Sequence, residues 1–94
     1  MADYEVECVS IDYDSPYDDC RSIEVVGFES VGGGITRMDP ADVHRMVADS
    51  EDEVHVVYHG ERSRVRPATD GDTRYVRAAD EDTPDDPLLK QPSC

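Results

Sequence analysis

The sequence predicts an α+β domain, a mostly antiparallel β-sheet covered on one side by a single short helix. The chain has 94 residues, enough for one domain with a modest core. Several stretches alternate apolar and polar residues, and only one shows helical spacing. We therefore expect a single domain over 1–94 in the order β-β-α-β-β-β. Its parts are an N-terminal β-hairpin at 1–30, a helix plus a three-stranded meander at 31–79, and a Pro-rich acidic strap at 80–94.

The N-terminal hairpin is predicted by two alternating stretches and the turn between them. YEVECVSI at 4–11 places apolar and acidic side chains on opposite faces of a half-buried strand. DYDSPYDDC at 12–20 is rich in turn residues. SIEVVGFES at 22–30 alternates again as far as Val26 and Gly27, where a bulge would return Phe28 to the core.

Asp39 and Pro40 mark the start of the helix, as an N-cap followed by a first-turn proline. Val43, Met46 and Val47 then share one helical face, which predicts a helix over 40–49. The three glycines at 32–34 lack the Lys and Ser/Thr of a phosphate-binding loop, so we interpret them as a flexible strand-to-helix connector.

Three further strands are expected after the helix. They are EVHVVYHG at 53–60, RSRVRPA at 62–68 and, after a turn at Asp70 and Gly71, TRYVRA at 73–78. Arg62, Arg64 and Arg66 would then project from one face of a single strand.

The acidic excess points to a salt-rich environment. The chain has 23 Asp and Glu, 9 Lys and Arg, and a net charge of -14. Eight of the nine basic residues are arginines, and the segment 54–79 alone is net positive. Such a surface repels itself in dilute buffer, whereas molar salt shortens the screening length to roughly 3 Å. This composition is typical of proteins from a salt-loaded cytoplasm, such as that of a halophilic archaeon.

Neither a membrane span nor a secretion signal is predicted. The sequence has no run of about 18 apolar residues and no basic-then-apolar amino terminus. We therefore expect a cytoplasmic protein that does not contact a membrane.

The cysteines and histidines give no standard metal or disulfide pattern. Cys8, Cys20 and Cys94 are odd in number and form no C-x-x-C pair, so we predict neither a disulfide framework nor a zinc site. Cys8 is interpreted as a small core residue. His55 and His59 would lie roughly 13 Å apart along a strand, too far to share one ion. We expect no metal and no cofactor, and a Cys/His metal or thiol protein remains an alternative.

No local motif marks a catalytic nucleophile, so we predict a non-enzymatic binding or interaction module. The arginines are its candidate contact surface, for an unidentified protein or anionic partner. On one strand they would be spaced about 6.6–7 Å apart, close to successive phosphates of a single-stranded nucleic acid. We favour the interpretation that these arginines pair with carboxylates on neighbouring strands, and nucleic-acid binding is the alternative. The chain is expected to be a monomer or homodimer. The candidate binding residues are Arg62, Arg64, Arg66, Arg74, Arg77 and Tyr75.

The strap at 80–94 contains three prolines that prevent a regular strand or helix. Leu88 and Leu89 would each forgo roughly 1.5–3 kcal/mol if they stayed in water. We therefore expect one of them to plug the open end of the core, the alternative being a disordered acidic tail that binds a partner. Leu88, Leu89 and Pro92 are the expected structural residues.

The C-terminal part of the chain is similar to a small family known as a domain of unknown function, DUF3892. In the resemblance, Arg74 to Arg77 form a basic-Tyr-aliphatic-Arg strand that leads through Asp80 and Thr83 to the segment containing Leu88, Leu89 and Pro92. The segment 32–56 resembles the family's strand, short helix and strand. The resemblance covers about 31–94, departs from the family at Ala78 and Pro87, and implies a fold unit without an activity.

Overall fold

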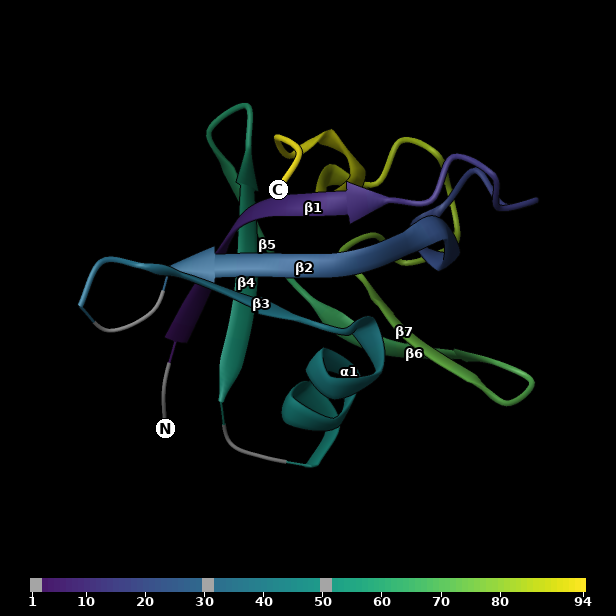
Figure 1. The fold of residues 1–94 in the computed structure, drawn as a ribbon, viewed down its shortest axis with the longest axis horizontal. Coiled ribbons are helices and arrows are strands. Elements are labelled where there is room, and N and C mark those ends of the chain that lie inside the picture. The colour runs from purple at the N-terminus through teal and green to yellow at the C-terminus, as the bar shows by residue number, and fades with distance from the viewer. Residues whose placement is uncertain (1–2, 30–31, 50–51) are drawn as a thin grey trace.

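The structure, a computed structural model, describes residues 3–29, 32–49 and 52–94 (Figure 1). It has the α+β fold expected from the sequence, with seven strands in two sheets and one α-helix in the described residues. Two short 3₁₀ turns, η1 and η2, complete it. The elements are β1 Asp3–Ile11, η1 Cys20–Ser22, β2 Ile23–Glu29, β3 Ile35–Met38, α1 Pro40–Asp49, β4 Glu53–Tyr58, β5 Glu61–Arg64, β6 Arg66–Asp70, β7 Thr73–Arg77 and η2 Pro87–Lys90.

The larger sheet has the strand order β3-β2-β1-β4-β5. Its pairs are antiparallel except β1 with β4, which run parallel through Asp3 opposite Glu53 and Glu5 opposite His55. The first residues of β1 pair with β4, and the residues from Val6 onward pair with β2. The register of the β1–β2 pairing shifts between Val6 and Cys8. The expected bulge is therefore present opposite Gly27, but its extra residue lies on β1.

The structure has two more strands than the sequence predicted, and the first arises at residues 62–68. These residues do not form one strand, because the chain breaks at Val65 and continues as β6, which pairs with β7 in a separate two-stranded sheet. The side chain of Val65 is buried and its N–H donates to Val54 O over 2.7 Å. The prediction of a three-stranded meander is therefore wrong. Burial of Val65 redirects the chain from one sheet to the other.

The glycine segment leads into a strand instead of directly into the helix. Gly32 and Gly33 have φ of 105° and 92°, a backbone conformation that favours glycine, and β3 begins at Ile35. Its four residues are exposed or half-buried, too few and too solvated to show a clear alternation. The connector interpretation is thus corrected to a turn between β2 and β3.

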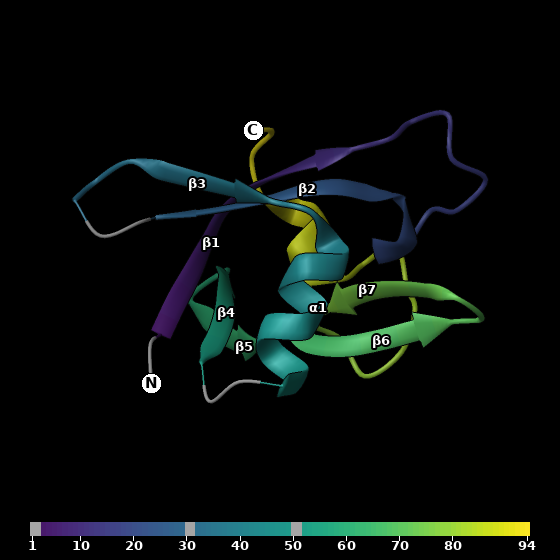
Figure 2. The ribbon, with the colours of Figure 1, turned by 60° about the horizontal axis from the view of Figure 1, so that its bottom comes forward.

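Helix α1 has the bounds that the sequence predicted, and Val43 is its fully buried residue. Figure 2 shows α1 between the β2–β3 part of the larger sheet and the β6–β7 hairpin. His44 Nδ1 donates to the carbonyl oxygen of Tyr75 on β7 over 3.0 Å. The helix therefore joins the two sheets in addition to covering one of them.

The core is built largely from valines and is completed by the strap. Leu88 from η2 is 0% exposed, so the expected plug is confirmed for Leu88, while Leu89 is only partly buried. The fully buried apolar residues of the strands and helix include Val6, Val9, Val26, Phe28, Val43, Val54, Val56, Val65, Tyr75 and Val76.

The strap is more regular than its prolines suggested. Asp86 caps η2 by accepting the N–H of Leu88, and Pro87 occupies the first turn, where its missing N–H costs nothing. Further on, Val9 N–H donates to Pro92 O over 2.9 Å and Cys94 N–H donates to Val9 O over 3.1 Å. These two hydrogen bonds join the strap to the part of β1 that lies beyond the residues paired with β4.

A disulfide joins Cys8 to Cys94, a pairing that the number and spacing of the cysteines did not predict, and the interpretation of Cys8 as a simple core residue is corrected. The two residues are 86 positions apart, and only the docking of the strap on β1 brings them together. Gly27 makes room for the bond, because a Cβ at this position would lie 2.9 Å from Cys94 Sγ and 3.2 Å from Ile35 Cγ2. Within the described residues, no helix is long and apolar enough to cross a bilayer.

Candidate functional site

Most of the arginines expected to form a contact surface are paired with carboxylates. Arg62 lies 2.7 Å from Asp3 of β1, and Arg64 lies 4.0 Å from Glu53 of β4. On the second sheet the pairs lead into the strap, with Arg66–Asp80 at 2.6 Å and Arg77–Asp82 at 2.9 Å. Arg74 is exposed on β7, and no ion pair joins it to another described residue.

A continuous arginine stripe is not formed. Arg62 and Arg64 lie on β5, whereas Arg66 lies on β6 of the other sheet. Tyr75 is 2% exposed and donates its hydroxyl to Asp82 over 2.7 Å, so it offers no face for stacking. Burial, together with this hydrogen bond, raises the pKa of Tyr75 to about 12. The structure thus assigns Tyr75 and Arg77 to a network with Asp82 that fixes the start of the strap.

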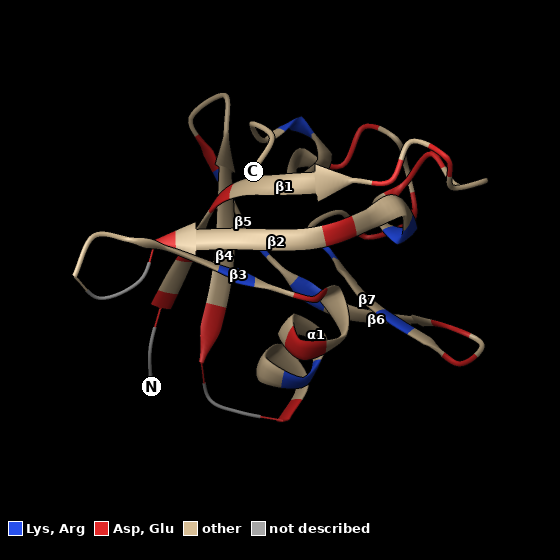
Figure 3. Cartoon of the chain, viewed as in Figure 1, with Lys and Arg blue, Asp and Glu red and all other residues tan. Residues whose placement is uncertain are grey.

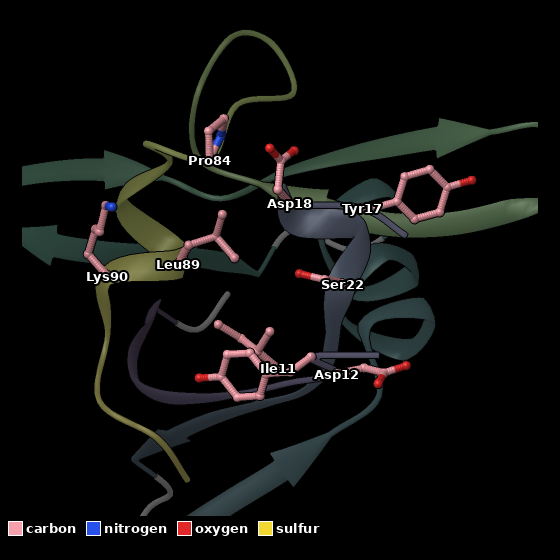
Figure 4. A pocket seen from close by; sticks show the side chains of 9 residues that line it. Ile11, Asp12, Tyr17, Asp18, Ser22, Pro84, Leu89 and Lys90 are labelled. Carbon is pink, nitrogen blue, oxygen red and sulfur yellow. The ribbon is translucent and has the colours of Figure 1, made fainter. Parts of the chain in front are cut away.

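A pocket of about 320 Å³ lies between the strap and the loop that joins β1 to η1, and we call it the strap pocket (Figure 4). The strap forms one wall with Pro84, Leu89 and Lys90, and the end of β1 and the following loop form the other. Most of the exposed wall is apolar. The residues that line it are Ile11, Asp12, Tyr13, Tyr17, Asp18, Ser22, Pro84, Leu89 and Lys90.

The loop wall is held by short-range polar contacts. Asp12 accepts the N–H of Asp14, and its own N–H donates to Ser22 O over 2.8 Å, which closes the loop onto η1. Asp19 caps η1, and its hydrogen bonds with Arg21 lower the pKa of the Asp19 carboxyl below its usual value. The Arg21 guanidinium also lies 4.0 Å from the centroid of the Tyr17 ring. Tyr17 is therefore positioned by stacking even though its other face is solvated.

The strap wall depends on Asp86, which is 0% exposed. Its carboxylate accepts the N–H groups of Ala78, Ala79 and Leu88 at 3.0, 2.9 and 2.8 Å. The N–H of Leu89 donates to Asp86 O over 2.9 Å. These bonds tie the strap to the end of β7 and orient Leu89 and Lys90 beside the pocket.

Sequence reasoning missed the strap pocket. The available signal was the placement of Tyr13 and Tyr17 in a turn otherwise made of Asp, Ser and Pro. Tyr13 is 84% exposed and Tyr17 is 42% exposed, so neither ring is used to build the core.

The thiol and histidine chemistry left open by the sequence finds little support. Cys20 is buried, and this burial, together with the nearby Asp86 carboxylate, raises the pKa of its thiol far above the usual value. His55 lies 2.7 Å from Asp3 and 3.2 Å from Arg62, within the β1–β4–β5 part of the sheet. Among the described residues, no three His, Cys, Asp or Glu side chains are grouped so as to hold a metal ion.

Acidic residues dominate the exposed loops and strand ends, including the tip of the β6–β7 hairpin (Figure 3). The arginines of the net positive segment are divided between β5 of the larger sheet and the β6–β7 hairpin (Figure 3). Comparison with known proteins adds no relative: no family model, no curated protein and no solved structure matches the chain.

Proposed function

We propose that the protein is a non-enzymatic binding module and that the strap pocket is its contact site. The observation that carries the proposal is an open pocket of about 320 Å³ with apolar walls and two exposed tyrosines. Pockets of about 300 Å³ are large enough for one side chain or a small ligand fragment. Exposed aromatic rings are a common feature of protein contact sites.

The pocket suits an apolar side chain that neighbours a positive charge. Its lining carries Asp12 and Asp18 against Lys90, and the whole chain carries a net charge of -14. Tyr17 already receives the guanidinium of Arg21 on its ring, which shows that this wall can stack a cation. The proposed occupant is therefore a segment of a partner protein that inserts an apolar residue next to an arginine or lysine.

The other functions considered from the sequence are less well supported. Single-strand nucleic-acid binding loses its main argument, because the arginines are divided between two sheets and four of the five candidates are paired with carboxylates. A thiol or metal protein would have to use a disulfide-bonded pair and a buried Cys20. The DUF3892 resemblance remains part of the proposal and supplies no activity.

We also propose a salt-rich cytoplasm as the location, on the basis of the acidic composition. The disulfide argues for a more oxidising compartment, since such bonds are rare in reducing cytoplasm. Trapping of free thiols with an alkylating reagent in freshly lysed cells decides between the reducing cytoplasm and an oxidising compartment. Two alkylated cysteines at positions 8 and 94 would show a reducing environment, and their protection would place the mature protein in an oxidising one.

The strap pocket is tested with two short peptides that differ only in charge, acetyl-Leu-Arg-amide and acetyl-Leu-Glu-amide. We expect the first to produce saturable NMR shifts in residues 12–18 and 84–90 and the second to produce none. Tyr13→Ala should weaken binding about two- to fivefold, the effect of losing a contact of 0.5–1 kcal/mol between a cation and an exposed ring. The matched control is Tyr58→Ala, since Tyr58 is an exposed tyrosine outside the pocket. Equal binding of both peptides, or an equal loss in both variants, would contradict the proposal.

A further inference from the structure

A second hollow lies beside the point where the chain passes from β5 to β6. It encloses about 500 Å³ and is lined by Val47 of α1 together with Arg64, Val65, Arg66 and Pro67, and we call it the arginine hollow. Four of its five lining residues belong to the segment 54–79, which is net positive. It shares no lining residue with the strap pocket.

The buried Val65 explains why two arginines line this hollow. Val65 is 1% exposed, and its backbone N–H is bonded to Val54 O. Since neighbouring residues of an extended chain point to opposite sides, burial of Val65 turns Arg64 and Arg66 outward together. Pro67 follows directly and restricts the backbone after Arg66. Burial of Val65 therefore fixes the outward direction of both arginines, although Arg64 and Arg66 belong to different sheets.

The carboxylates that face these arginines are weak competitors for a ligand. Arg64 and Glu53 are 4.0 Å apart, and both side chains are more than half exposed. Arg66 binds Asp80 through Nη1 at 2.6 Å, but the Asp80 side chain is 87% exposed. Exposed ion pairs contribute about 0–1 kcal/mol. A guanidinium has five N–H donors, so one such contact leaves donors for a further anion.

We propose that the arginine hollow binds the phosphate group of a small phosphorylated molecule. Two arginines can each form paired hydrogen bonds with phosphate oxygens, a geometry that lysine does not reproduce. Val47 and Pro67, together with the buried Val65, provide an apolar part of the wall for the organic part of the ligand. The proposal is independent of the strap pocket, and it gives the paired arginines a function beyond support of the sheet.

A small ligand fits this surface better than a nucleic-acid strand. A strand needs a row of cations, and here Arg62, the next arginine along β5, lies outside the hollow. The acidic surroundings would repel a polyanion over a distance. At molar salt that long-range repulsion is screened within about 3 Å, while direct contacts between guanidinium and phosphate persist.

The test is an NMR titration of the full chain at constant ionic strength, with inorganic phosphate and phenyl phosphate as probes. We expect saturable shifts of the Val47 and Val65 amides with both probes and tighter binding of phenyl phosphate, whose ring contacts the apolar wall. Arg64→Ala and Arg66→Ala should each weaken binding about tenfold or more, the effect of losing charge-assisted hydrogen bonds. Arg64→Lys should recover only part of the loss.

Arg62→Ala is the matched control, because it removes the same charge from the same strand outside the hollow. Its affinity should stay within about twofold of the parent, and Glu53→Gln should bind phosphate more tightly because Arg64 is released. All three arginines are exposed, so unchanged circular dichroism should accompany each variant. Absence of saturation, or an equal loss in Arg62→Ala, would overturn the proposal. So would tighter binding of a single-stranded oligonucleotide that depends on Arg62, which would indicate a nucleic-acid surface instead.

Discussion

Asp86 has a structural role that its place in an acidic tail conceals. It is fully buried, and three backbone N–H groups at the end of β7 and the start of η2 donate to its carboxylate. A buried carboxylate is tolerated when hydrogen bonds replace its hydration. One residue therefore joins the strap to the second sheet.

Replacing Asp86 should destabilise the fold strongly. Asp86→Ala leaves two buried N–H donors and one part-buried donor without this partner, at a cost of about 1–3 kcal/mol for each buried one, so we expect a loss of about 3–5 kcal/mol. Asp86→Asn keeps one acceptor oxygen and should lose less. Asp85→Ala, at the exposed neighbouring position, should change the free energy of unfolding by about 0.5 kcal/mol or less. Urea unfolding at constant salt measures all three, and an Asp86→Ala protein as stable as Asp85→Ala would refute this role.

Tyr75 should control stability at alkaline pH. Its pKa is raised to about 12 in the folded protein by burial and by the bond to Asp82, against about 10 in an unfolded chain. The unfolded state therefore releases this proton first, and the free energy of unfolding should fall between pH 10 and pH 12, by about 2–3 kcal/mol in total. Below pH 10 the contribution is fully present.

Tyrosinate absorbance during an alkaline titration measures this effect. One ionisation should appear late, near pH 12, and should vanish in Tyr75→Phe, while Tyr13→Phe should leave it in place. If the late ionisation persists in Tyr75→Phe, the assignment is incorrect.

The burial and the roles of individual residues were the hardest features to predict from the sequence. The chain has 23 acidic residues, and no local pattern distinguishes the buried Asp86 from its exposed neighbours. Tyr75 was proposed as a candidate stacking face, but the alternation of its strand does not reveal that Tyr75 and its neighbour Val76 are both buried and that the Tyr75 hydroxyl binds Asp82. Hydrophobicity predicted that one of the two strap leucines is buried, but only the structure shows that it is Leu88.

At the scale of elements, the strap is fixed to β1 by both hydrogen bonds and the Cys8–Cys94 disulfide. Closing a loop of this length restricts the unfolded chain, which in the chain-entropy model is worth about 4–5 kcal/mol. Reduction, or Cys94→Ser, should lower stability by an amount of this order. The strap wall should nevertheless stay in place, because Asp86 and Leu88 hold η2 independently.

Urea unfolding with and without a dithiol reductant gives the stability, and amide exchange of residues 86–90 reports the strap. In Cys94→Ser the reductant should have no further effect. A reduced protein that is as stable as the oxidised one would show that the bond is not formed in solution.

Helix α1 and the first hairpin were predictable because their signals are local: an N-cap, a proline, and apolar spacing. The break at Val65 was not, because residues 62–68 have the pattern of a continuous strand and only the burial of Val65 between two sheets interrupts it. The disulfide depends on the docking of a segment 86 positions away. No spacing rule in the sequence encodes that contact.

For the whole molecule, salt should determine stability. A net charge of -14 on a radius of gyration of 12.1 Å places like charges close together. Raising salt from about 0.1 M to 1 M shortens the screening length from about 10 Å to about 3 Å. We expect a gain of about 2 kcal/mol, which corresponds to a rise in Tm of roughly 10 °C for a domain of this size.

Thermal unfolding in KCl and in an equal concentration of an uncharged osmolyte separates screening from general stabilisation. Only KCl should raise Tm strongly, and a Tm independent of KCl would contradict the salt-adapted interpretation.

The disulfide has a topological consequence. With Cys8 bonded to Cys94, the backbone between these two residues is closed into a covalent ring. A protease that cuts the exposed β4–β5 turn at His59 and Gly60 would open the ring without releasing a fragment. The two parts of the cut chain would remain joined through the Cys8–Cys94 bond and would separate only after its reduction.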